Sequence, residues 1–179
     1  MAQHDPATGI AETVADAAQR EAAAYLHGEE HPLGGYLGIM GVYVASVGAG
    51  ALVARLLGRR VPRRLSTRDI VLTGVATFRI SRLMAKDPVT SPVRAPFTRF
   101  EGVSGPAELN EEVRGQGVRH AVGELVTCPF CIGHWVATAF GFGFVLAPEV
   151  TRFVTAMMSA EAAADFLQFA YSAVEQRVQ

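Results

Sequence analysis

Residues 32–54 read PLGGYLGIMGVYVASVGAGALVA and contain no charged side chain. A helix needs about 20 mostly apolar residues to cross the roughly 30 Å hydrocarbon core of a bilayer, and this stretch has 23. Gly34 and Gly38 are four residues apart, a spacing of small residues that is typical of close helix packing in membranes. We expect a membrane helix here, and the alternative is a buried helix of a soluble protein.

A second uncharged stretch, residues 125–148, favours the same fold class. It is 24 residues long and ends at Pro148. Half of the chain is apolar and 18% is charged, against about 25% in an average soluble domain, and the mean hydropathy is +0.23. The sequence therefore predicts an all-α membrane protein with three to four membrane helices, a polar middle loop and the lipid bilayer as its surroundings.

The basic residues are clustered instead of spread over the chain. Six arginines lie within residues 55–68, directly after the first apolar stretch. Positive charge beside a membrane helix marks its cytoplasmic end, so we expect the N-terminus to lie outside. The net charge of −1 gives no general basic surface for nucleic acid. A second row of small residues lies at Gly41, Ala45 and Ala49. These rows suggest a homo-oligomer or a larger membrane assembly, and the alternative is that glycine is simply common in membrane helices.

The chain divides into a polar, acidic N-terminal tail in residues 1–31 and a helical membrane domain in residues 32–179. Residues 11–27 are alanine-rich with scattered charges, so a thin amphipathic helix and a frayed tail are both open interpretations. The first 30 residues have no basic segment leading into an apolar core, and no cleavable signal peptide is expected.

A shorter apolar run in residues 70–85 predicts another helix. Ser66 and Asp69 have the spacing of a capping box, which predicts where this helix begins. Arg79 and Arg82 lie three residues apart on one of its faces. Because an arginine in lipid is costly without a partner, the helix either turns these arginines into a bundle or ends near the membrane surface.

A last helix is predicted to begin near Thr151. It carries Glu161 and Asp165, four residues apart on one face. One hypothesis pairs these acids with Arg79 and Arg82 across a bundle, and the other leaves them as a solvated acidic face.

Residues 86–124 form the polar middle loop. Its prolines, at positions 88, 92, 96 and 106, interrupt any long helix. A short helix is expected over residues 108–114.

The motif with the clearest chemistry is CPFC at residues 128–131. The start of a helix stabilises a thiolate, which favours redox or disulfide chemistry of Cys128 and Cys131. Together with His134, the two cysteines also suggest a zinc site, which would need His120 or a second subunit to complete four ligands. The third interpretation is structural, with both cysteines acting as small apolar residues.

No other motif suggests catalysis, because phosphate-binding glycine loops, Gly-x-Ser-x-Gly and His-Glu-x-x-His are missing from the sequence. We therefore predict no catalytic residue, and no cofactor beyond the zinc hypothesis. The leading function is a structural, assembly or accessory membrane protein that acts through helix packing. The alternative is a membrane thiol–disulfide or metal-binding protein that uses the two cysteines.

The chain resembles the bacterial membrane-protein family known as domain of unknown function 1360, over about residues 67–169. The resemblance rests on FRISRL at residues 78–83, KD at 86–87, PVR at 92–94 and GELVTCPFCIGHWV at 123–136. The matching motif positions are Arg79, Asp87, Arg94, Glu124, Cys128, Cys131 and Trp135. Since the family has no settled activity, the resemblance implies a location in a bacterial inner (cytoplasmic) membrane and a shared motif without naming a reaction.

Overall fold

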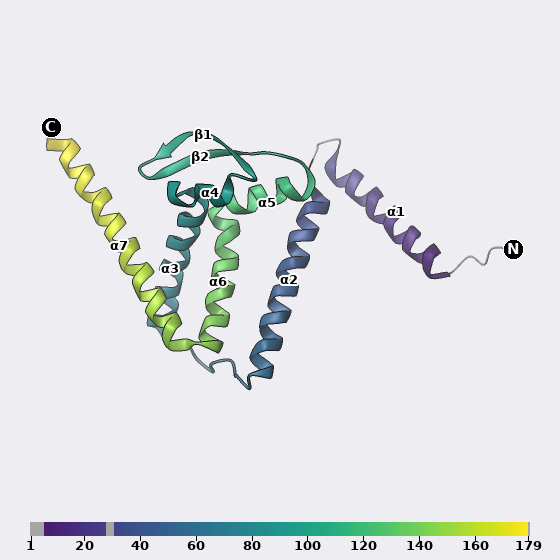
Figure 1. Cartoon of the computed structure of the whole chain (residues 1–179), viewed down its shortest axis with the longest axis horizontal. Coiled ribbons are helices and arrows are strands. Elements are labelled where there is room, and N and C mark those ends of the chain that lie inside the picture. The colour runs from purple at the N-terminus through teal and green to yellow at the C-terminus, as the bar shows by residue number, and fades with distance from the viewer. Residues whose placement is uncertain (1–5, 28–30, 179) are drawn as a thin grey trace.

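The computed structural model describes residues 6–27 and 31–178, most of which are helical (Figure 1). Four long helices, α2, α3, α6 and α7, run up and down between two ends of the molecule. A β-hairpin and two short helices cover one end, and α1 lies beside the bundle. The elements are α1 (Pro6–Leu26), α2 (Leu33–Leu56), α3 (Thr67–Lys86), the 3-10 helix η1 (Pro88–Thr90), α4 (Ser91–Arg94), β1 (Thr98–Gly105), β2 (Glu108–Val113), α5 (Gly117–Thr127), α6 (Pro129–Leu146) and α7 (Pro148–Val178).

Two of these helices, α2 and α6, are long and apolar enough to cross a membrane. Their most apolar windows have mean hydropathies of 1.9 and 1.5, and none of the α2 window is buried inside the protein. Exposed apolar side chains follow α2 along its length, from Leu37 to Leu52. Soluble monomers rarely expose so large a continuous apolar surface.

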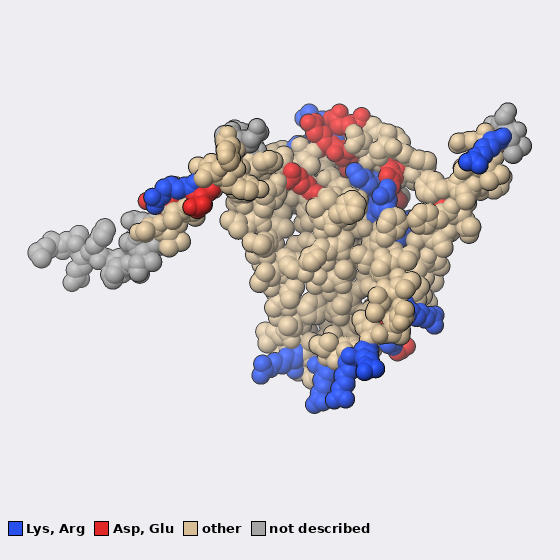
Figure 2. Space-filling model, turned by 180° about the vertical axis from the view of Figure 1, so that it is seen from behind, with Lys and Arg blue, Asp and Glu red and all other residues tan. Residues whose placement is uncertain are grey.

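Charge gathers at the two ends of the bundle (Figure 2). The arginines of residues 55–68 are exposed in and around the link from α2 to α3. Acidic and basic residues gather together at the opposite end, and a broad band between the two ends carries little charge on the face shown. This distribution follows directly from the alternation of apolar and charged segments in the sequence.

The predicted start of α3 is confirmed. The Asp69 backbone N–H donates to Ser66 Oγ at 3.0 Å, and the Ser66 N–H donates to Asp69 Oδ2 at 3.3 Å. Such a reciprocal pair satisfies two of the N–H groups that a helix start leaves free. The last helix begins at Pro148, three residues before the predicted Thr151, because proline suits the first turn of a helix.

The prediction of a short helix over residues 108–114 is wrong. Residues 108–113 form β2, which pairs antiparallel with β1 from Thr98↔Val113 to Gly105↔Glu108. Pro106 and Ala107 make the turn, with Ala107 at a φ of +58°. Pairing with β1 outweighs the weak helical preference of so short a segment, so the polar middle contains a hairpin.

The uncharged stretch 125–148 is also not one helix. Helix α5 ends at Thr127, Cys128 is extended with φ −101° and ψ 108°, and α6 begins at Pro129. Proline disfavours the helical conformation in the residue before it. The break therefore falls at the first cysteine of the motif and lets α5 turn across the end of the bundle.

A close backbone approach fixes α2 against α5. A Cβ atom at Gly35 would lie 2.8 Å from the Gly117 carbonyl oxygen and 2.9 Å from Ala121 Cβ. By contrast, a Cβ at Gly34 or Gly38 would have no neighbour within 4 Å, so the predicted row of small residues makes no close contact within this chain.

Candidate functional site

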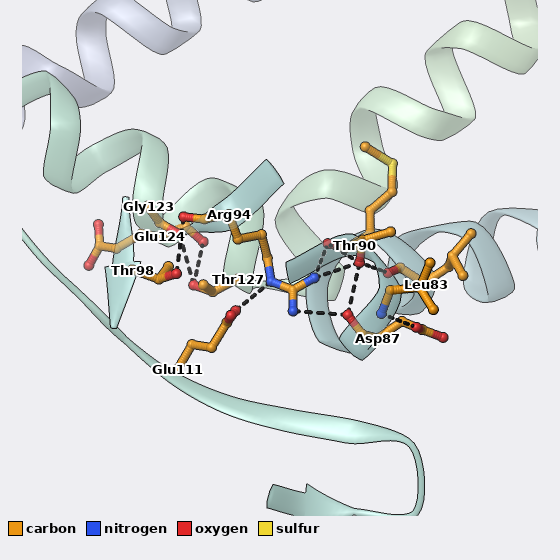
Figure 3. Close-up of polar contacts among 11 residues, drawn as sticks. Leu83, Asp87, Thr90, Arg94, Thr98, Glu111, Gly123, Glu124 and Thr127 are labelled. Carbon is orange, nitrogen blue, oxygen red and sulfur yellow. Dashed lines mark hydrogen bonds and ion pairs between the residues drawn. The ribbon is translucent and has the colours of Figure 1, made fainter. Parts of the chain in front are cut away.

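A buried arginine joins the segments at the hairpin end of the molecule (Figure 3). The Arg94 side chain is 1% exposed, and its Nε donates to the Glu111 carboxylate on β2. Its Nη1 donates to the Met84 carbonyl at 2.8 Å and to Thr90 Oγ1 at 2.6 Å, and its Nη2 donates to the Asp87 carbonyl at 3.1 Å. Arg94 thereby ties the end of α3, η1 and β2 together.

Asp87 takes part through its backbone and its side chain. Its carbonyl accepts the Arg94 bond, while its Oδ1 accepts from the Val89 N–H at 2.8 Å and caps η1. A buried ion pair is stable only when its remaining polar groups are also satisfied, which this arrangement achieves. The motif positions Asp87 and Arg94 thus meet in one network that shapes the hairpin platform, by which we mean η1, α4, β1 and β2.

The pairing of α3 with the acids of α7 is confirmed for one arginine. Arg79 Nη2 lies 2.7 Å from Glu161 Oε1, and Arg79 Nε lies 3.0 Å from Asp165 Oδ2. Arg82 instead donates from Nε to Glu108 Oε1 on β2 at 2.9 Å. The pairing predicted for Arg82 is therefore wrong, because this residue is nearly a turn closer to the hairpin.

The two cysteines interact directly at the start of α6. The Cys131 N–H donates to Cys128 Sγ at 3.3 Å, and the Cys131 thiol donates to the same sulfur at 2.7 Å. Both are free thiols, and their sulfurs are farther apart than the roughly 2.05 Å of a disulfide bond. Only a small movement would join them.

The surroundings of Cys128 favour its thiolate. Burial raises the pKa of the Cys128 thiol, but hydrogen bonds from Cys131 and from the backbone at Phe130, together with the charge of Lys86, lower it more, so that the pKa lies below its ordinary value. A thiolate is the nucleophilic form of cysteine. The first cysteine of the motif is therefore the expected nucleophile, and the second stands beside it.

Glu124 links this motif to α2. Its carboxylate accepts a hydrogen bond from the Tyr36 hydroxyl, and its Oε1 lies 3.5 Å from His120 Nε2. The Cys128 N–H donates to the Glu124 carbonyl at 3.2 Å. An acidic side chain consequently lies one helical turn before the nucleophilic cysteine.

A cleft of about 840 Å³ opens between α2, α5 and α6 beside these groups. Tyr43 forms its aromatic wall, with ring centroids 4.9 Å from His134 and 5.1 Å from Trp135, and its hydroxyl lies 2.7 Å from Thr138 Oγ1. Both cysteines, Tyr36, Met40 and Glu124 also line it. We call this space the dithiol cleft.

The structure does not support the zinc hypothesis with a set of ligands. Among residues 6–27 and 31–178, no group of three or more His, Cys, Asp or Glu side chains is placed to hold a metal ion. The His134 ring lies against Tyr43. His120 turns to Glu124 and to the Gly115 carbonyl, which lies 3.2 Å from Nδ1.

Four residues that contact the motif residues give no sign of this role in the sequence. Tyr36 and Tyr43 suggest only membrane-interface residues, and Glu108 and Glu111 suggest only a charged loop. The Tyr36–Glu124 contact joins residues 88 positions apart. Only the packing of α2 against α5 brings them together.

The fold and the site define a mostly helical bundle with a dithiol at one end, next to a hairpin fastened by a buried arginine. Residues 72–171 match the model of the family described as "Protein of unknown function (DUF1360)", and the chain belongs to this family. The resemblance found from the sequence motifs is thus confirmed.

Two relatives come from Bacillus subtilis (strain 168). The chain is similar to sporulation protein YjcA, with 37% identity over 71 residues that cover 38% of this chain and 60% of that protein. It is also similar to UPF0713 protein YngL, with 26% identity over 103 residues that cover 55% of this chain and 77% of that protein. No solved structure matches the chain.

Proposed function

We propose that the chain is an integral membrane protein in which α2, α3, α6 and α7 cross the bilayer. Helix α2 has an apolar surface that its own fold leaves uncovered, and lipid is the surrounding that would make this surface stable. Helices α3 and α7 have 20 and 31 residues, and a rise of about 1.5 Å per residue makes each long enough to span the hydrocarbon core.

The charges of α3 and α7 are compatible with this placement. Arg79 has a side chain that is 14% exposed and is paired with Glu161 and Asp165. Charged residues within membranes are usually paired with one another and turned toward the bundle. The ion pairs between α3 and α7 thus offset part of the cost of placing Arg79 in lipid, while the Glu161 and Asp165 side chains remain 41% exposed.

The arginine cluster of residues 55–68 supports one orientation. Under the positive-inside rule it belongs on the cytoplasmic side. The hairpin platform, the start of α2 and the start of α6 lie at the opposite end of the bundle (Figure 1). Cys128 is the N-cap of α6 and Cys131 lies in its first turn. In a bacterial inner membrane these elements would face outward, where disulfides form and persist.

We propose thiol–disulfide exchange at Cys128 and Cys131 as the function of this end. The observation that carries the proposal is the convergence of the Cys131 N–H and thiol on Cys128 Sγ, at 3.3 Å and 2.7 Å. A partner's thiolate would attack Cys128 Sγ of the oxidised Cys128–Cys131 pair and expel the Cys131 thiolate. The partner's second thiolate would then attack the partner sulfur of this mixed disulfide and expel the Cys128 thiolate, so that the partner gains a disulfide and the pair is left as the dithiol. This order makes Cys128 the leaving group, which suits the cysteine whose surroundings favour the thiolate.

Trapping experiments test this function. Cells that express the protein are quenched with acid, and free thiols are then tagged with a mass-shifting maleimide. We expect a mixture of reduced and oxidised wild-type protein, and a stable mixed disulfide with another protein or a small thiol in Cys131→Ser but not in Cys128→Ser. A pair that stays fully reduced in the wild type, with no adduct in Cys131→Ser, would contradict the proposal.

A second candidate is a structural, assembly or accessory role. The Arg94 network favours it, because it fixes the hairpin platform as a preformed surface at one end of the bundle. Because one relative is named a sporulation protein, a Bacillus subtilis strain that lacks this relative is the first place to test complementation. The double variant Cys128→Ser/Cys131→Ser separates the two candidates, since an accessory role survives it and thiol exchange does not.

A further inference from the structure

A dithiol that cycles needs a partner that takes or supplies two electrons. Within the described residues the chain has only the Cys128–Cys131 pair for this chemistry. Its electron partner must therefore reach the pair from outside the chain. The dithiol cleft is the space from which such a partner could contact both sulfurs.

The walls of the dithiol cleft suit a flat apolar ring better than a water-soluble thiol. Tyr43 and Trp135 meet edge to face at 5.1 Å, and Tyr43 also contacts the His134 ring. Aromatic faces and edges of this kind favour stacking with another ring. Met40 on α2 lines the same cleft and is 56% exposed, so the cleft opens onto the apolar surface that we place in lipid.

Polar groups are few in the dithiol cleft but are placed where a ring with two carbonyl oxygens could use them. Within the part of the chain that the structure describes, neither ring nitrogen of His134 has a hydrogen-bond partner. The Tyr36 hydroxyl and the Glu124 carboxylate lie on the same lining as the sulfurs. Such sites typically combine an apolar wall with a few polar groups that fix orientation.

We infer that the dithiol cleft binds a lipid-soluble quinone, which accepts the two electrons of Cys128 and Cys131. The inference rests on the proposed thiol–disulfide function and names its electron acceptor. His134 would donate a hydrogen bond to one quinone oxygen from the wall of the cleft. Electrons then flow from the dithiol to the quinone dissolved in the membrane.

The reaction balances with these components alone. The Cys128 thiolate forms a carbon–sulfur bond to the quinone ring, and the displaced electron pair moves to a quinone oxygen, which takes a proton. Cys131 then attacks Cys128 Sγ and the carbon–sulfur bond breaks. The electron pair of that bond moves through the ring to the second quinone oxygen, which takes the second proton. Two thiols and one quinone thus become one disulfide and one quinol.

The test uses the full-length protein, purified in detergent and fully reduced. It is mixed with decylubiquinone, and both the loss of quinone absorbance and the loss of free thiols are followed. We expect one quinone to be reduced for each pair of thiols lost, and no quinone reduction by Cys128→Ser/Cys131→Ser. Oxidation by the water-soluble reagent diamide is measured in parallel.

Matched variants connect the reaction to the dithiol cleft. Met40→Trp fills the cleft, and Val44→Trp adds the same side chain one turn further along α2, where the exposed residue does not line it. We expect Met40→Trp to slow oxidation by quinone about tenfold or more, and to leave oxidation by diamide unchanged. Val44→Trp should leave both rates unchanged.

The outcomes distinguish the two proposals. If diamide forms the disulfide but quinone does not, or if Met40→Trp and Val44→Trp react with quinone equally fast, the quinone inference fails and the thiol–disulfide function stands. If neither oxidant joins Cys128 to Cys131, the thiol–disulfide function fails as well.

Discussion

Arg94 on α4 and Glu111 on β2 form an ion pair that is almost closed to solvent, with side chains that are 1% and 6% exposed. Loss of one partner leaves the other charge buried and unpaired, which typically costs about 3–5 kcal/mol. We therefore expect Arg94→Met to lower the free energy of unfolding by about this amount, measured by denaturation in detergent and followed by circular dichroism.

A double variant provides the control for this pair. Arg94→Met/Glu111→Leu removes both charges, so it should recover part of the lost stability. Recovery should stay incomplete, because the Met84 and Asp87 carbonyls still lose their donor. If Arg94→Met were as stable as the wild type, the buried network would have no role in holding the hairpin platform.

The Arg79 pairs predict a graded loss of stability. Glu161→Ala and Asp165→Ala each leave Arg79 paired with one acid, so each should lower the free energy of unfolding by about 1 kcal/mol. The double variant leaves the Arg79 charge unpaired and should lower it by about 3 kcal/mol. Thermal unfolding in detergent measures this. Glu149→Ala is the matched control, because its pair with Arg152 is exposed and should contribute less than about 1 kcal/mol. Equal and negligible effects in all four proteins would refute the α3–α7 pairing.

Gly35 and Gly34 should respond differently to the same substitution. A Cβ at Gly35 would clash with the Gly117 carbonyl at 2.8 Å, so Gly35→Ala should destabilise the protein by about 1–3 kcal/mol through overpacking. Gly34→Ala meets nothing within 4 Å and should be neutral or slightly stabilising, since alanine is the better helix former. Protease sensitivity of α5 measures both, and equal sensitivity would show that α2 does not pack on α5 in this way.

The pH dependence of alkylation tests the surroundings of Cys128. Because the pKa of Cys128 lies below its ordinary value and a hydrogen bond from Cys131 helps to lower it, the thiolate should persist to lower pH than in a free cysteine. Cys131→Ala removes that donor, so the pKa of Cys128 should rise and the iodoacetamide rate profile should shift to higher pH. A profile that stays in place would mean that Cys131 does not stabilise the thiolate.

The sequence predicted those helices whose position is set by residues close together in the chain. The spacing of Ser66 and Asp69 located the start of α3, and the uncharged run 32–54 located α2, because capping and length act within a few turns of chain. Pro129 also carried a signal, since its effect on Cys128 divides residues 125–148 into two helices. That local signal is present in the sequence, but the overall absence of charge there favours one long helix.

Contacts between distant residues were less predictable. The opposite charges of α3 and α7 predicted the Arg79–Glu161 pair, yet Arg82 has the same charge and pairs with Glu108 instead. The choice depends on where the hairpin lies, and β2 was predicted as helix. The dithiol cleft shows the same limit, because the motif fixes the cysteines and Glu124 while Tyr36 and Tyr43 reach them only through the packing of α2.

Maleimide labelling in intact cells tests most directly the claim that a membrane-spanning bundle presents the Cys128–Cys131 dithiol on its outer side. A membrane-impermeant maleimide is applied with and without prior reduction, with Cys128→Ser/Cys131→Ser as the blank. The account predicts labelling of intact cells, increased by reduction as the oxidised fraction is opened. Labelling that appears only after the cells are broken open would place the pair in the cytoplasm and contradict both the orientation and the proposed function.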